Sequence, residues 1–182
     1  MAYLLRVLNI LMILGLGIVF LTAKGLLEIE GQNHLGLAIP YFIFAIFVQA
    51  FTMFYFIGVG RFTKNIYEII STGQRLDELF EVVPDNFKKY EEKVKKFFFD
   101  SETFKRQTIP WTMLMLTLGT IAFLLGGAHD TGLVEKHVHS GVAYGFAASS
   151  LIGFVRQWIY LGKAHFHLRK IKGLFMIDDN SM

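Results

Sequence analysis

The sequence contains no cysteine and only three prolines among its 182 residues. The absence of cysteine excludes disulfide bonds, thiolate metal sites and iron–sulfur clusters, and it leaves the redox compartment undetermined. The sequence also lacks a nucleophile triad, a phosphate-binding loop and a His-Glu-x-x-His motif. We therefore expect no enzyme that works within a membrane, and the function has to be sought among other classes.

Charge is excluded from four long stretches of the chain. No Asp, Glu, Lys or Arg occurs in 7–23, 35–60, 107–128 or 138–155. A helix rises about 1.5 Å per residue, so about 20 apolar residues cross the roughly 30 Å core of a bilayer. The chain is also 53% hydrophobic, which is too apolar for an ordinary soluble domain. Four such stretches predict a polytopic membrane protein.

The pattern predicts an all-α fold, an integral membrane four-helix bundle with cytoplasmic amphipathic helices, in one domain over residues 1–182. The expected segments are spans at about 3–23, 35–60, 107–128 and 138–161, a helical connection at 61–106 and a tail at 162–182. Asp100 and Ser101 are typical helix-capping residues, and they predict the start of a helix that runs into the third span.

Lys and Arg are distributed unevenly among the connections. The segment 61–106 holds ten and the tail after the fourth span holds four, whereas the other two connections hold only Lys24 and Lys136. Positive-inside bias therefore predicts that both termini are cytoplasmic, in the inner membrane of a bacterium or archaeon. The basic face also predicts contact with anionic lipid, and no stacking motif accompanies it that would indicate nucleic acid.

An apolar stripe runs along the second half of the long connection. Its members recur at helical spacing: Phe87, Tyr90, Val94, Phe97 and Phe98. The stripe could pack against the bundle or a second copy, lie on the anionic inner leaflet, or bind a soluble partner. A similar pattern around Ile171 and Phe175 predicts a short amphipathic helix in the tail, on the inner leaflet.

Small residues recur every four positions along the fourth span. They are Gly141, Gly145, Ser149 and Gly153. Small residues let helix backbones approach closely in a membrane, so the stripe predicts a packing seam, either within the chain or between copies in a homo-oligomer or larger complex. The alternative is a groove that holds a flat cofactor or a lipid chain.

Two polar residues interrupt the spans. Gln49 lies near the middle of the second span and is expected to bond a neighbouring helix, with a transport or proton-path role as the alternative. Arg156 closes the uncharged part of the fourth span. It either extends to the cytoplasmic headgroups or pairs with an acidic residue or a phosphate.

Four histidines and an aspartate gather at the outer ends of the spans. They are His34, His129, Asp130, His137 and His139. Imidazoles with a carboxylate suit Zn, Cu or Fe, and facing histidines can ligate haem, so a transition metal or haem at the outer face is one hypothesis. The other is that these histidines hydrogen-bond headgroups and backbone.

Four functions remain open from the sequence. The leading one is a non-catalytic subunit of a homo-oligomer or larger membrane complex that packs through the glycine stripe. The others are a metal- or haem-binding membrane protein, a channel or ion-driven motor component, and a carrier for a lipid or another hydrophobic molecule. For the third, the layout of spans and termini resembles, in topology alone, the stator and proton-channel subunits of bacterial motors and energy transducers.

Overall fold

The computed structural model describes residues 1–30 and 34–175, and these residues form helices and turns without a β-sheet. The helices are α1 (Ala2–Ala23), α2 (His34–Thr72), α3 (Glu91–Asp130) and α4 (Lys136–Phe175), with the short 3-10 helices η1 (Leu76–Glu78) and η2 (Phe87–Tyr90) between α2 and α3. All four α-helices are long and apolar enough to cross a membrane. The all-α fold with four such helices is thus confirmed.

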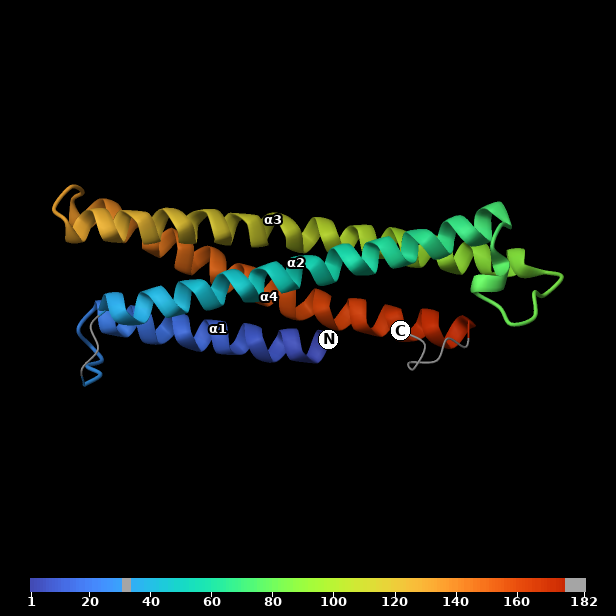
Figure 1. The fold of residues 1–182 in the computed structure, drawn as a ribbon, viewed down its shortest axis with the longest axis horizontal. Coiled ribbons are helices and arrows are strands. Elements are labelled where there is room, and N and C mark those ends of the chain that lie inside the picture. Colours follow the sequence, from blue (N-terminus) through green and yellow to red (C-terminus); the bar gives the residue numbers. More distant parts are fainter. Residues whose placement is uncertain (31–33, 176–182) are drawn as a thin grey trace.

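The bundle is elongated, and its two ends differ (Figure 1). Helices of 39 or 40 residues are about 60 Å long, whereas the 22 residues of α1 cover about 33 Å. All four helices therefore lie side by side only at one end, which we call the four-helix end. At the other, the three-helix end, α2, α3 and α4 continue beyond the first residue of α1.

Apolar side chains cover the outside of the part of the bundle that contains α1. Leu14, Phe54, Leu124 and Val155, one from each helix, are all more than half exposed. In water such a surface would drive aggregation, whereas contact with lipid tails carries no such penalty because the tails are equally apolar. This distribution is typical of a membrane protein.

The long helices do not stop where the uncharged stretches stop. Helix α2 continues to Thr72, and α3 already begins at Glu91. The predicted helix start at Asp100 and Ser101 is wrong, because the Ser101 hydroxyl donates to the Phe98 carbonyl inside α3 and lies 2.6 Å from the Thr63 hydroxyl of α2. Charged Lys and Glu residues are good helix formers, so a loss of apolarity does not end a helix.

The apolar stripe of the connection packs within the chain. Val94 is buried beside Ile66 and Ile70 of α2 and Ile171 and Phe175 of α4. The first of the proposed alternatives for the stripe, packing against the bundle, is therefore the one observed. The predicted short tail helix is wrong as a separate element, because these residues continue α4 and close the same core.

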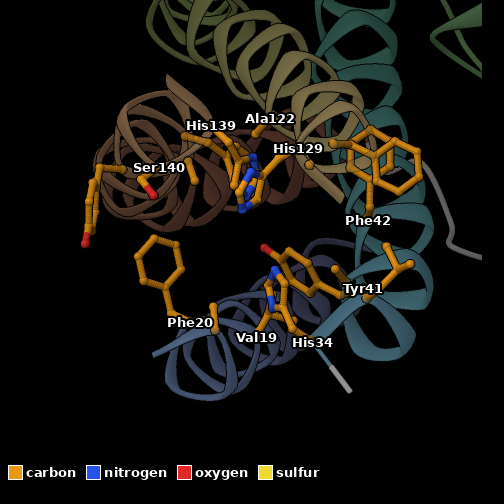
Figure 2. A pocket seen from close by; sticks show the side chains of 18 of the residues that line it. Val19, Phe20, His34, Tyr41, Phe42, Ala122, His129, His139 and Ser140 are labelled. Carbon is orange, nitrogen blue, oxygen red and sulfur yellow. The ribbon is translucent and has the colours of Figure 1, made fainter. Parts of the chain in front are cut away.

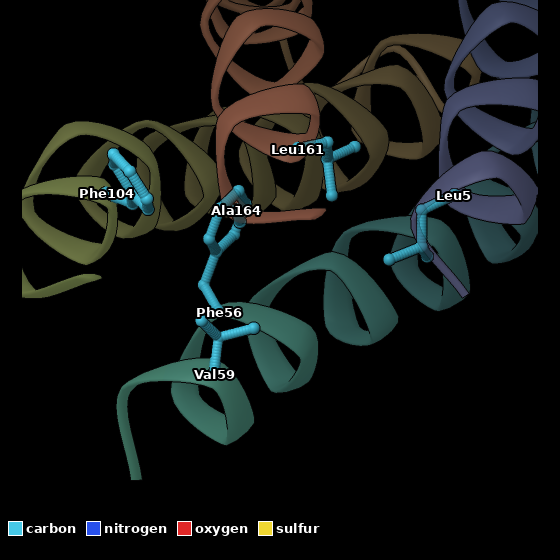
Figure 3. Close-up of a cluster of buried hydrophobic side chains, with 6 residues drawn as sticks. All are labelled: Leu5, Phe56, Val59, Phe104, Leu161 and Ala164. Atoms are coloured by element: carbon cyan, nitrogen blue, oxygen red, sulfur yellow. The ribbon is translucent and has the colours of Figure 1, made fainter. Parts of the chain in front are cut away.

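A second core lies where α1 begins beside the other helices. Leu5, Phe56, Phe104 and Leu161, one from each helix, meet there with Val59 and Ala164 (Figure 3). This core lies near the level at which the four-helix part becomes the three-helix part.

A polar cluster lies in the middle of the bundle. The Gln157 amide nitrogen donates to Gln49 Oε1 at 2.6 Å and to Thr112 Oγ1 at 2.9 Å, and all three residues are buried. The expected interhelical bond of Gln49 is therefore confirmed. Its partner Gln157 was missed, although its place directly after Arg156 marks it as a polar residue inside the span.

Candidate functional site

A cavity of about 410 Å³ lies between the four helices at the four-helix end. Its inner part is apolar and is lined by residues of every helix: Leu16, Val19, Phe42, Ala122, Phe123 and Phe146. Its outer part is polar, because the helices end there and their capping residues and loops follow. The polar lining residues are Lys24, His34, Tyr41, His129, Asp130, Lys136, His139, Ser140 and Tyr144.

The α3–α4 connection places two of the histidines. Helix α3 ends at Asp130. In the turn that follows, Gly132 has φ +75°, and the Leu133 amide donates to the Ala128 carbonyl at 2.9 Å. This closing turn favours glycine because a side chain would be strained at positive φ. It makes the connection short, so the rings of His129 and His139 come to lie 6.2 Å apart and nearly parallel.

The local hydrogen bonding sets the tautomer of His129. Its Nδ1 lies 3.1 Å from the Val134 carbonyl oxygen, which can only accept. Nδ1 therefore donates to this oxygen. In the neutral ring, Nε2 has a lone pair that can accept a hydrogen bond or ligate a metal.

Three buried polar atoms of the cavity lining have no hydrogen-bond partner among the described residues. They are His34 Nδ1, Tyr41 Oη and His139 Nδ1. Figure 2 shows His129 and His139 on one side of the cavity, with Tyr41 and His34 opposite. A buried polar group left without a partner costs about 1–3 kcal/mol. Three such atoms line this one cavity, and each has hydrogen-bonding capacity left.

A cation–π contact lies at the edge of the cavity. The Lys24 ammonium hydrogen-bonds the Tyr144 hydroxyl and lies 4.9 Å from the centre of its ring. The pair joins the end of α1 to α4. Sequence reasoning missed Lys24, Tyr41 and Tyr144 as lining residues, because nothing in their spacing connects α1, α2 and α4.

The structure brings four of the five predicted outer-face residues to this cavity: His34, His129, Asp130 and His139. His137 is not among them, since its exposed ring lies 3.0 Å from the Glu135 carboxylate. Within residues 1–30 and 34–175, no three His, Asp or Glu side chains are arranged to hold a metal ion. A metal or haem at these residues stays a prediction, and the described residues do not form a ready set of ligands for a metal ion.

The glycine stripe divides between two environments. A Cβ on Gly153 would lie 2.6 Å from Met115 of α3, and Ser149 is buried. At Gly141 and Gly145 an added Cβ would meet nothing within 4 Å. A straight helix has 3.6 residues per turn, so two residues that are twelve positions apart lie about 120° from each other around the helix axis. Gly141 therefore faces away from the α3 contact that Gly153 makes.

Arg156 pairs with polar and aromatic groups of α3. Its Nη1 donates to Gln107 Oε1 at 3.0 Å, and its guanidinium carbon lies 5.4 Å from the centre of the Trp111 ring. In the part of the chain that the structure describes, it makes no ion pair. The two sequence interpretations of Arg156 therefore remain predictions.

The two histidines near the end of α4 are separated. His165 packs edge-on against Tyr3 of α1, whereas His167 packs against Phe97 and Phe104 of α3. Burial lowers the pKa of the His167 imidazole, although Asp100 Oδ2, 3.7 Å away, opposes the shift. The neutral form is therefore favoured in the folded protein.

Comparisons of the chain with protein families, with curated proteins and with solved structures gave no match in any of the three. The cavity and the residues that line it are therefore the features that bear on function.

Proposed function

We propose that this protein is a non-catalytic membrane protein that binds a small amphipathic molecule in the cavity at the four-helix end. The observation that carries the proposal is the set of three unpartnered polar atoms on His34, Tyr41 and His139, placed above an apolar inner wall. A cavity of about 410 Å³ is within the range of about 300–1,000 Å³ that small-molecule sites occupy.

The lining indicates the chemistry of the ligand. Phe42, Phe123 and Phe146 offer aromatic surface to an apolar body. The tyrosine hydroxyl donates, and an unprotonated histidine nitrogen accepts. A ligand hydroxyl satisfies both groups, whereas a ligand carbonyl satisfies the tyrosine. We infer a hydrophobic molecule with a hydroxyl or carbonyl head, held with its head toward the end of the bundle. Such binding is the first step that a carrier for a hydrophobic molecule requires.

We further propose that the four helices span the inner membrane of a bacterium or archaeon, with the three-helix end in the cytoplasm. The ten Lys and Arg of 61–106 support this orientation. The exposed apolar surface around α1 supports insertion. The cavity then opens toward the outer face, with its inner wall at the depth of the lipid tails.

The experiment is organic extraction of the purified, detergent-solubilised protein, followed by mass spectrometry of the extract. Wild type is compared with Tyr41→Phe and His139→Leu, which change the lining, and with His137→Ala, which lies outside it. The proposal expects one enriched small molecule that both lining variants lose and the control keeps. Extracts that match an unrelated membrane protein prepared in the same way would refute it.

A second candidate is assembly into a homo-oligomer through the outer part of the glycine stripe. The open space at Gly141 and Gly145 favours it, because a second helix backbone can approach closely there. Gly145→Leu is expected to shift the protein to a smaller species in size-exclusion chromatography with light scattering. Gly17→Leu is the matched control, since Gly17 of α1 is exposed and also has open space at its Cβ. Equal behaviour of the two variants would refute the assembly.

A further inference from the structure

A second cavity lies on the opposite side of the polar cluster, between the start of α1 and α4. Its volume is about 300 Å³, and Tyr3, Arg6, Gly162, His165 and Arg169 are among the residues that line it. It is separate from the cavity of the proposed function and shares no residue with it. We call it the Arg6 cleft.

The Arg6 guanidinium is held in a defined seat. Its Nη2 donates to the Trp158 carbonyl at 3.0 Å, and its carbon lies 4.7 Å from the centre of the Trp158 ring. Gly162 makes the seat possible, because a Cβ there would clash with the guanidinium. Arg6 Nε is buried and has no hydrogen-bond partner among the described residues.

The charge of this cleft is not neutralised by the two helices that form it. Neither α1 nor α4 contains an Asp or Glu, and Arg6 makes no ion pair within the described residues. Arg169 adds a second permanent positive charge, and His165 adds a titratable nitrogen. A half-buried guanidinium is normally paired, so the cleft has the composition of an anion site.

The position of the cleft matches that of lipid phosphates. Tryptophan rings gather at membrane–water interfaces, and Arg6 on Trp158 and Arg156 on Trp111 are two such pairs. Arg6 is also only about 6 Å along α1 from its first residue. In the proposed orientation this level is the cytoplasmic headgroup layer.

We propose that the Arg6 cleft binds a phosphate group, with the headgroup of an anionic phospholipid or free phosphate as its two sources. The guanidinium and Arg169 supply charge-assisted hydrogen bonds, and Tyr3 and His165 border the phosphate. The proposal rests on membrane insertion for the lipid source but not on a ligand in the other cavity. A failed extraction experiment therefore leaves it standing.

The test measures binding of short-chain phosphatidylglycerol, phosphatidylcholine and inorganic phosphate to the full-length protein in a nonionic detergent. The variants are Arg6→Gln, Arg169→Gln and Gly162→Ala. The last keeps every charge and only displaces the guanidinium. Arg61→Gln is the control, because Arg61 is an exposed cation of α2 outside the cleft. Circular dichroism establishes whether each variant is folded. If Arg6→Gln does not fold, Arg169→Gln still tests the proposal, because Arg169 is exposed.

The proposal expects phosphatidylglycerol to bind more tightly than phosphatidylcholine, with its affinity lowered about fivefold by each cleft variant and unchanged in Arg61→Gln. If inorganic phosphate binds with the same dependence on the variants and the lipids do not, the source is free phosphate. Affinities that are equal in wild type and the cleft variants, or an equal loss in Arg61→Gln, would overturn the proposal, since attraction would then come from surface charge alone.

Discussion

Replacing Gln157 by Leu tests whether the polar cluster stabilises the bundle. The side chain is fully buried and contacts two other helices through Gln49 and Thr112. Leucine of similar size removes the bonds to Gln49 and Thr112, including the 3.4 Å bond that Gln49 Nε2 donates to Gln157 Oε1, and it leaves Gln49 Oε1 without its 2.6 Å donor. A buried acceptor left alone costs about 1–3 kcal/mol, and interhelical bonds in membranes contribute about 1–2 kcal/mol. We expect a loss of about 2 kcal/mol in the free energy of unfolding.

The matched variant is the double replacement of Gln49 and Gln157 by Leu. Removing both partners leaves no unpaired Gln49 side chain. The further losses are the bond from Gln157 to Thr112 Oγ1 and a weak contact of Gln49 Nε2, which lies 3.1 Å from Met12 Sδ. The double variant should therefore be more stable than the sum of the two single losses predicts. The assay is unfolding by a denaturing detergent in mixed micelles, followed by circular dichroism. Losses that add within about 0.5 kcal/mol would refute a coupled pair.

Three further predictions concern orientation, pH and packing. Because the chain lacks cysteine, Leu133→Cys should react with a membrane-impermeant maleimide in intact cells and Val82→Cys only after lysis; the reverse pattern would invert the orientation. Since the pKa of His167 is lowered by folding, its unfolded form binds more protons, so the free energy of unfolding should fall as pH drops below about 6.5. His167→Gln should flatten that part of the stability curve, and an unchanged slope would contradict the reasoning. Gly153→Leu should cost about 1–3 kcal/mol in the same unfolding assay through its clash with Met115, and an unchanged stability would show that the helices can separate there.

The coarse fold could be predicted because charge patterning decides it. In a charge-free stretch of membrane length, a helix satisfies every backbone hydrogen bond within the segment. Accordingly, α2 begins at His34 and α4 at Lys136, within a few residues of the predicted span starts. The ends of α2, α3 and α4 at the three-helix end could not be predicted from charge in the same way. Lys, Arg and Leu are good helix formers and recur after residue 161, so α4 reaches Phe175 instead of stopping there.

The candidate site could be predicted only in part. His129 and His139 lie at the same end of the bundle because a short connection joins their two spans, and this could be predicted from the sequence. The contribution of Tyr41 requires the placement of α2 against α3 and α4, which no local pattern encodes. The different environments of Gly145 and Gly153 follow from the 3.6-residue period, which a four-residue repeat does not match.

Native mass spectrometry of the purified protein, released gently from detergent, would detect a molecule bound in the cavity. We predict one small-molecule adduct per chain in wild type and in His137→Ala, and a bare chain in Tyr41→Phe and His139→Leu. A wild-type chain that is always released bare, or an adduct that persists in both lining variants, would contradict a ligand site among His34, Tyr41 and His139.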